Sequence, residues 1–201
     1  SREAVDRVIA HAPGIVIVDE AYAEFTDDGR IATAPMYDRL LVTRTLSKAF
    51  GMAGFRIGYG AGAAALIHEI EKVRGPYKEN APAERAAVAA LREDVAWMRD
   101  AAAQAVANRE RFADALRANG MRPLPSDANF LLIPLSNALL VAQRMREQGV
   151  AVRPYPGLPG IGDALRLTIG PWSIMELALD ALLRARESVG GIQAEPTNAE
   201  R

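Results

Sequence analysis

The chain has 201 residues, of which 50% are hydrophobic and 24% charged, and its formal net charge is −1. Acidic and basic residues are mixed, so the composition offers no positive face for a nucleic acid, and no apolar run reaches the ~18 residues of a membrane span. The absence of cysteine excludes disulfides and thiolate metal sites, and His11 and His68 have no metal-ligand partners at useful spacing.

The first part of the chain is predicted to alternate strands and helices. Apolar runs rich in β-branched residues and leucine predict buried strands, whereas apolar positions three and four apart predict helices. Pro13-Gly14 and Gly75-Pro76 are expected to end helices. We expect strands at 15–18, 40–43 and 55–60, and helices at 3–11, 31–37, 63–73 and 83–91.

The later part begins with a long helical pattern from Glu93 to Asn119, followed by Gly120 as its C-cap. Beyond it, strands are expected at 121–125, 129–133, 150–153 and 164–169, with a helix at 139–148. Ser173 and Glu176 have the spacing of a capping box, which predicts a last helix to about Arg186. The sequence therefore predicts an α/β fold with a mixed, mainly parallel sheet, followed by a small α+β domain.

Two polar residues follow predicted strands and can act together. Asp19 ends the first strand, and Lys48 lies on a loop after the second. Ligands of open α/β sheets bind outside the carboxyl ends of the strands, so we expect both residues at one sheet edge. A lysine held out of water loses its proton more easily, and the neutral amine can form a Schiff base with an aldehyde.

The neighbours of Lys48 suit one particular aldehyde. Thr45, Ser47 and Arg56 together provide the hydroxyls and the guanidinium that hold a phosphate monoester. Pyridoxal phosphate carries both an aldehyde and such a phosphate. An aspartate such as Asp19 can pair with its pyridinium nitrogen, and Tyr22 could donate a hydrogen bond to its phenolic oxygen.

Plainer interpretations exist for each residue taken singly. Lys48 fits a solvated lysine, Asp19 a strand-end acid and Tyr22 a core tyrosine, while Glu20 is expected to be structural or solvent-facing. The segment 58–63 also fits a loose G-x-G-x-x-A pattern for a dinucleotide. The acid expected about 20 residues further on, at the end of a second strand, is missing, so we do not favour that site.

The order of these residues resembles a known cofactor site. The segment Asp19-Glu20-Ala21-Tyr22 and the uninterrupted match from Thr45 to Tyr59, TLSKAFGMAGFRIGY, are similar to fold-type I aminotransferases, and most similar to the histidinol-phosphate aminotransferase branch. The resemblance implies that residues 1–92 are the C-terminal part of a large pyridoxal-phosphate-binding domain, and that residues 93–189 form the small domain. The polar segment 190–201 is expected to be a disordered tail.

The resemblance also implies a role for each site residue. Lys48 would carry the cofactor and move a proton, while Asp19 and Tyr22 would tune the ring. Thr45, Ser47 and Arg56 would anchor the phosphate of the cofactor.

Substrate contacts are implied for two arginines of the small domain. Arg166, in Leu165-Arg166-Leu167-Thr168-Ile169-Gly170, would bind the substrate carboxylate, because its fork is bidentate. Arg153, thirteen residues earlier, would bind the substrate phosphate. Asn129-Phe130 resembles the family strand that lines the domain junction, where a structural role is equally expected.

The implied reaction is transamination of histidinol phosphate with 2-oxoglutarate and glutamate as the co-substrate pair, in histidine biosynthesis. A homodimer is expected from the family, and a cytoplasmic location because residues 1–6 lack the apolar core of a signal peptide. Alternatives are an aromatic amino acid aminotransferase, a threonine-phosphate decarboxylase of the same fold, and a non-catalytic fragment. The last follows because the resemblance covers only the latter half of a family member and omits several cofactor contacts.

Overall fold

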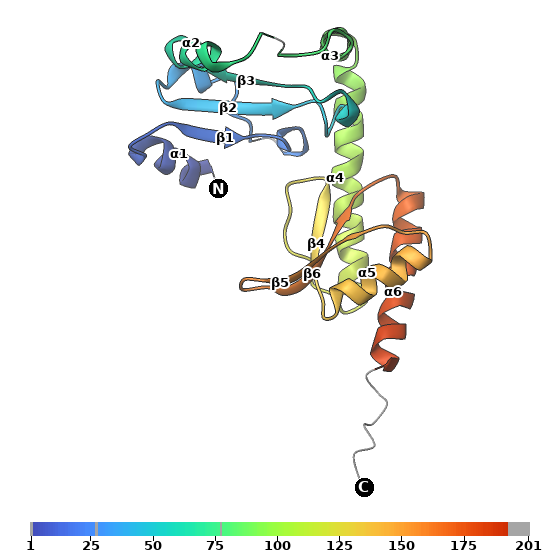
Figure 1. The fold of residues 1–201 in the computed structure, drawn as a ribbon. Coiled ribbons are helices and arrows are strands. Elements are labelled where there is room, and N and C mark those ends of the chain that lie inside the picture. The colour runs from blue at the N-terminus through green and yellow to red at the C-terminus, as the bar shows by residue number, and fades with distance from the viewer. Residues whose placement is uncertain (1, 27, 77, 193–201) are drawn as a thin grey trace. The chain divides into compact units, whose positions relative to one another are not determined.

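A computed structural model describes residues 2–26, 28–76 and 78–192 of the chain (Figure 1). The chain divides into two compact units, Ser1–Ala103 and Gln104–Arg201. The division falls within helix α4, Val95–Ala118, whereas the sequence placed the boundary ahead of this helix, between residues 92 and 93. Each unit contains its own three-stranded sheet.

The first unit is built around the sheet β1-β2-β3. Strand β1, Val16–Asp19, pairs in parallel with β2, Leu40–Thr45, and β2 pairs antiparallel with β3, Gly58–Gly62. Helices α1, Arg2–His11, α2, Ala64–Val73, and α3, Ala81–Glu93, flank these strands in the chain. Single turns of 3₁₀ helix occur at Ala23–Phe25, Ala34–Met36 and Ala53–Phe55.

Alternation of side chains explains the core of this unit. Leu40 and Val42 of β2 are 1% and 0% exposed and pack with Ala34, and Val16 and Val18 of β1 pack against them. Ile17 points to the other face and is 65% exposed. The expectation that the first strand is buried throughout was therefore wrong, because a strand with one covered face buries every second residue.

Strand β3 begins later than expected, at Gly58 rather than residue 55, because Ala53–Phe55 forms a 3₁₀ turn. Its glycines allow close approach to β2: a Cβ on Gly58 would lie 2.5 Å from the carbonyl oxygen of Arg44. The G-x-G-x-x-A pattern thus lies mainly in a strand rather than at a strand-to-helix turn. This arrangement does not fit a dinucleotide-binding loop.

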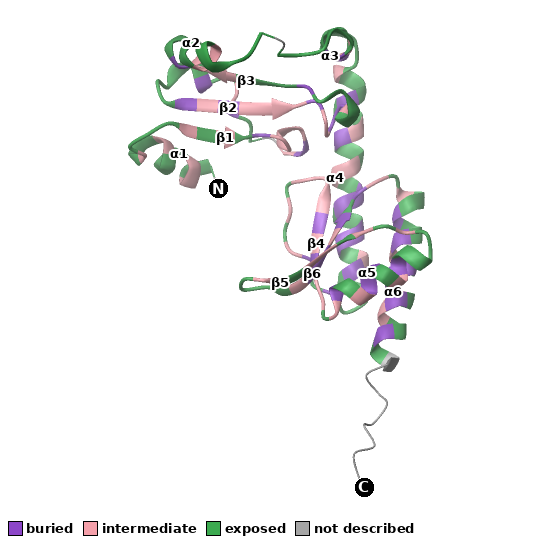
Figure 2. Ribbon diagram, viewed as in Figure 1, coloured by how far each residue is buried: buried purple, intermediate pink, exposed green. Residues whose placement is uncertain are grey.

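The second unit contains an antiparallel sheet in the order β4-β6-β5. Its strands are β4, Phe130–Pro134, β5, Arg153–Leu158, and β6, Gly162–Thr168. Helices α5, Ala138–Glu147, and α6, Trp172–Ile192, pack with the later part of α4. The shared core is seen in Figure 2 as buried positions along α4, α5 and α6, and includes Phe112, Leu116, Ile133, Met145, Leu165, Met175 and Leu182.

Four predictions for this unit need correction. Residues 121–125 form no strand, because Pro123 and Pro125 lack the amide hydrogens that a ladder needs. The strand expected at 150–153 begins only at Arg153. Helix α6 begins at Trp172, so Ser173 lies inside it and is no N-cap, and the helix continues to Ile192, beyond the expected start of a tail at residue 190. The rest of that predicted tail, residues 193–201, lies outside the described residues.

Candidate functional site

The carboxyl ends of β1 and β2 bring two predicted site segments to one sheet edge. In the parallel pair Asp19 is the register partner of Thr43, and β2 ends two residues later at Thr45. Lys48 follows in the turn beyond that end. Asp19 is exposed, and its Oδ1 accepts a hydrogen bond of 3.0 Å from the Ala21 amide. The acid and the lysine loop therefore face the same side of the unit, as parallel strands require.

Tyr22 lies between these two segments. The nitrogen Nζ of Lys48 stands 5.3 Å from the centre of the Tyr22 ring, within the range of a cation–π contact. Both side chains are half-buried. The structure thus places Lys48 next to Tyr22, which lies three residues after Asp19 in the chain.

Buried anchors hold the lysine loop on both sides. Leu46, Ala49 and Phe50 are no more than 9% exposed, so the backbone around Lys48 is fixed to the core. The Met52 amide donates to the Leu46 carbonyl at 2.9 Å, and the Gly51 amide donates to the Lys48 carbonyl at 3.0 Å. Gly51 has φ +68°, a conformation that glycine adopts without strain. These contacts keep Lys48 on a tight, defined turn.

The three residues predicted to hold a phosphate lie around the same turn. Thr45 Oγ1 accepts from the Ser47 amide at 3.1 Å, and Arg56 Nη1 lies 3.5 Å from Ser47 Oγ. Arg56 also donates to the Ala53 carbonyl at 3.0 Å, and its backbone is left-handed with φ 56°. Two hydroxyls and one exposed guanidinium converge beside an amine, and this donor set fits the aldehyde and phosphate of pyridoxal phosphate.

Replacing Gly58 by alanine is expected to disturb this edge of the sheet. Its Cβ would lie 2.5 Å from the Arg44 carbonyl oxygen, so β2 and β3 must separate next to Thr45. We expect a loss of about 1–3 kcal/mol in the free energy of unfolding. Gly60→Ala is the matched control, since its nearest atom would be the Val42 carbonyl oxygen at 3.4 Å. Thermal unfolding of both variants checks this, and equal midpoints would contradict it.

A buried group of charges behind this edge was missed by the sequence analysis. Glu20, whose side chain is 6% exposed, pairs with Arg44 at 2.9 Å. Burial alone would lower the pKa of Arg44, but the hydrogen bond and charge of Glu20 outweigh it and raise that pKa. Burial raises the pKa of Glu24, which lies 3.9 Å from the same arginine. Glu20 is therefore structural, and the alternative that it faces solvent was wrong.

The two predicted substrate arginines meet in the second unit. Arg153 of β5 and Arg166 of β6 are direct partners in the antiparallel register. Directly opposite side chains lie on the same face of a sheet, so both arginine side chains project from one face. The Arg166 guanidinium lies 3.9 Å from the centre of the Phe130 ring, which fixes its direction. Such a pair of guanidinium groups is suited to an anion with several oxygens.

Two buried polar residues of α4 hold segments next to β6 and β4, and neither was predicted from the sequence. Asn108 donates to the Gly170 carbonyl at 2.9 Å, just after β6. Arg109 donates to the Ala128 carbonyl at 3.0 Å, just before β4. Their burial, 4% and 6% exposed, follows from these long-range contacts. In the sequence, Asn108 and Arg109 do not differ from ordinary exposed polar residues of a helix.

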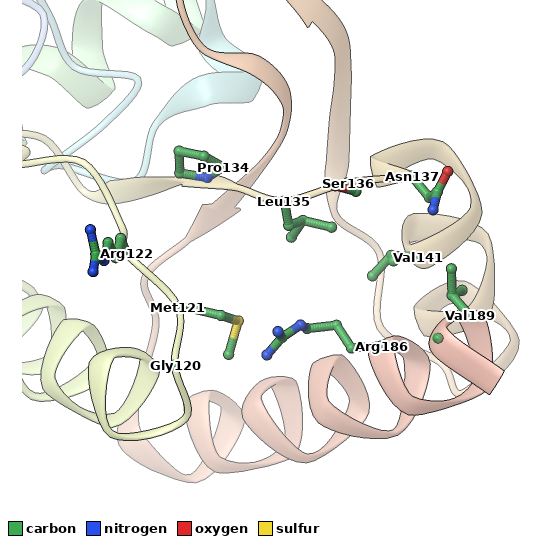
Figure 3. Close-up of a pocket in the computed structure, with 11 residues that line it drawn as sticks. Gly120, Met121, Arg122, Pro134, Leu135, Ser136, Asn137, Val141, Arg186 and Val189 are labelled. Carbon is green, nitrogen blue, oxygen red and sulfur yellow. The ribbon is translucent and has the colours of Figure 1, made fainter. Parts of the chain in front are cut away.

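A separate hollow of about 450 Å³ lies in the second unit, beside the C-terminal part of α6. Figure 3 shows the side chains of Met121 and Arg186 pointing toward one another across it, with Asn137 at its rim. None of the predicted site residues lines this hollow. Within the described ranges, no group of three or more potential metal ligands occurs, and no helix is long and apolar enough to cross a membrane.

Comparison with known proteins assigns the family. The model of the family "Aminotransferase class I and II" matches residues 1–182. The chain belongs to this aminotransferase family. The predicted fold class is thereby confirmed: the first unit has the mixed sheet, and solved aminotransferases superpose on the chain.

Individual members of the aminotransferase family give the extent of the match. The histidinol-phosphate aminotransferase of Caldanaerobacter subterraneus is 35% identical over 90% of this chain and 51% of its own length. That of Methylibium petroleiphilum is 42% identical over 83% and 44%. The crystal structure of the Sinorhizobium meliloti histidinol-phosphate aminotransferase with pyridoxal-5′-phosphate superposes with a TM-score of 0.80 at 27% identity, over 92% of this chain and 53% of that one. The chain therefore spans about half the length of these relatives.

Proposed function

We propose that this chain contributes to pyridoxal-phosphate-dependent transamination, with histidinol phosphate as amino donor and 2-oxoglutarate as acceptor. The observation that carries the proposal is the placement of Lys48 beside Tyr22 and next to the turn after Asp19. Family membership over residues 1–182 supports the reaction class. Histidinol-phosphate aminotransferases among the similar proteins support the substrate.

Different residues of the first unit would bind different groups of the cofactor. Lys48 Nζ would bind the aldehyde carbon, and Thr45, Ser47 and Arg56 would hold the phosphate. When bound, pyridoxal phosphate supplies an electron sink for the bond that is broken at the α-carbon of the substrate. The Asp19 carboxylate would keep the ring nitrogen protonated, and Tyr22 would donate to the ring oxygen. Lys48 Nζ, once free, would carry the proton as base and then as acid.

Arg153 and Arg166 are proposed to bind the anionic groups of the substrates. Like charges directly opposite in a strand pair repel one another, so a bound phosphate or carboxylate would stabilise this pair. A phosphorylated amine carries more negative charge and more anionic oxygen atoms than an aromatic amino acid, which has a single carboxylate. This favours histidinol phosphate over an aromatic amino acid.

The remaining parts of the proposal rest on the family alone. We propose that residues 1–92 belong to the large domain and residues 93–189 to the small one. We also propose that the protein acts as a homodimer and that it is located in the cytoplasm.

The reaction is tested by incubating the chain with pyridoxal phosphate, 2-oxoglutarate and histidinol phosphate, and by measuring glutamate. We expect glutamate to form faster than with phenylalanine as donor. Faster turnover of phenylalanine would favour the aromatic alternative. Binding of the cofactor without any glutamate formation would contradict transamination by this chain and favour the non-catalytic alternative.

Arg153→Ala is expected to raise the KM for histidinol phosphate by about tenfold or more, because one charge-assisted hydrogen bond to the phosphate is lost. The KM for phenylalanine should change less than about twofold, since that donor has no phosphate. Arg122→Ala is the matched control, an exposed arginine of the same unit outside the strand pair. Steady-state kinetics with both donors checks this, and an equal rise for both would argue against a phosphate contact.

A further inference from the structure

Glu20 connects strand β1, strand β2 and the 3₁₀ turn Ala23–Phe25 next to the proposed cofactor site. It follows Asp19 directly, and its amide donates to the Thr43 carbonyl of β2 at 2.8 Å. Its own carbonyl accepts from the Ala23 amide at 3.1 Å, which begins the 3₁₀ turn after Tyr22. Both main-chain groups of this one residue are thus used to fix the turn.

The side chain of Glu20 ties the same turn to β2. Its Oε2 accepts a hydrogen bond of 2.9 Å from Arg44 Nε and lies 2.9 Å from Arg44 Nη2 in an ion pair. Its Oε1 accepts from the Arg30 amide, so both carboxylate oxygens have partners. Arg44 lies on β2 between Thr43 and Thr45, one residue before the first of the predicted phosphate contacts. The ion pair therefore joins the turn that carries Asp19 and Tyr22 to the strand that leads into the lysine loop.

The pair is enclosed. The side chains of Arg44 and Glu20 are 19% and 6% exposed. A Cβ added to Gly29 would overlap Arg44 Nη2, so the main chain at Gly29 closes over the guanidinium. Removing one partner of a buried pair leaves the other charge without compensation, which is far more costly than losing an exposed pair.

We propose that Glu20 and Arg44 are positioning residues that hold Asp19 and Tyr22 in place for the cofactor. The inference rests on the proposed function, because it concerns the same site. Neither side chain is expected to touch the cofactor. Small displacements of contacting groups have large effects on binding and rate, so the ion pair should act through the turn that it fixes.

The test uses Glu20→Gln in the 201-residue chain. The amide keeps the shape and can still accept from Arg30, but it removes the charge that Arg44 needs. Hydrogen exchange should accelerate about tenfold or more at the amides of Ala23 and Phe25, which donate to carbonyls within the turn. The dissociation constant for pyridoxal phosphate, from absorbance titration, should rise about tenfold.

Two further variants make the test decisive. Glu71→Gln is the matched control, since Glu71 near the end of α2 forms partly exposed ion pairs with Arg74 and Lys78, and both readouts should stay as in the unchanged chain. Arg44→Lys keeps the charge but offers one nitrogen instead of two, so its effects should be smaller than those of Glu20→Gln. If Glu20→Gln does not fold, Arg44→Lys tests the inference instead. Hydrogen exchange is then expected to be faster at the amides of the turn and unchanged elsewhere.

The inference is overturned if exchange in the turn is unchanged in the folded variants, or if it accelerates equally at the Val18 and Val42 amides of the strands. It is also overturned if exchange accelerates while cofactor affinity stays the same. If the unchanged chain binds no pyridoxal phosphate, the proposed function fails for this chain. Exchange at the turn still decides whether the ion pair fixes it.

Discussion

Lys48→Ala is expected to abolish retention of pyridoxal phosphate and to lower any transamination rate by about 10³-fold or more. The alanine side chain can neither bind the aldehyde nor move the proton, and Tyr22, 5.3 Å away, supplies no amine. Absorbance of the chain after gel filtration with the cofactor measures retention, and glutamate formation measures the rate.

Lys72→Ala is the matched control for Lys48→Ala. Lys72 pairs with Glu69 on the exposed side of α2, and its side chain is 54% exposed. Its replacement should leave retention and rate unchanged. A Lys48→Ala chain that retains cofactor as well as the Lys72→Ala chain would remove Lys48 from the proposed role.

Phe112→Ala is expected to destabilise the second unit by about 3–5 kcal/mol. Phe112 is 0% exposed and lies in the cluster that joins α4 to β4, α5 and α6. Truncation removes its apolar area and leaves a cavity that neighbours such as Leu116 and Leu182 fill only in part. Urea unfolding followed by circular dichroism measures the change.

Leu177→Ala provides the comparison in the same unit, because Leu177 is 59% exposed. The free energy of unfolding of the Leu177→Ala variant should differ from that of the unchanged chain by less than about 1 kcal/mol. Similar losses for the two variants would contradict the assignment of Phe112 to a closed core.

The arrangement of the candidate site was predictable because it depends on short segments and one rule of topology. A strand followed by Asp19 and another followed by Lys48 only need to pair in parallel for the two residues to share an edge, and the register Val18↔Val42 provides this. The order of Thr45, Ser47 and Arg56 around the lysine is likewise local, since all three lie between the end of β2 and the start of β3.

The buried charges behind the site were not predictable in this way. Glu20, Arg30 and Arg44 look like surface residues by type, but Glu20 and Arg30 are buried and Arg44 is partly buried, through contacts between segments that are distant in sequence. The approach of the Gly29 main chain to Arg44 contributes to the enclosure of this pair. A pattern of residue types carries no information about that enclosure.

Strand limits were the least predictable feature. Gly58-Tyr59-Gly60-Ala61-Gly62 has low intrinsic strand preference, and its pairing with β2 decides its limits. Residues 121–125 have apolar alternation but two prolines, which prevent a ladder. Arg153 and Arg166 were predicted separately, whereas their direct pairing depends on the register of β5 and β6.

Reductive trapping tests the central claim most directly. The chain has three lysines, Lys48, Lys72 and Lys78, so a pyridoxyl group fixed by borohydride can be assigned by peptide mass spectrometry. With pyridoxal phosphate at a concentration close to that of the chain, we predict modification of Lys48, with Lys72 and Lys78 unmodified. Modification spread equally over the three lysines, or absent from Lys48, would contradict a cofactor site at this sheet edge.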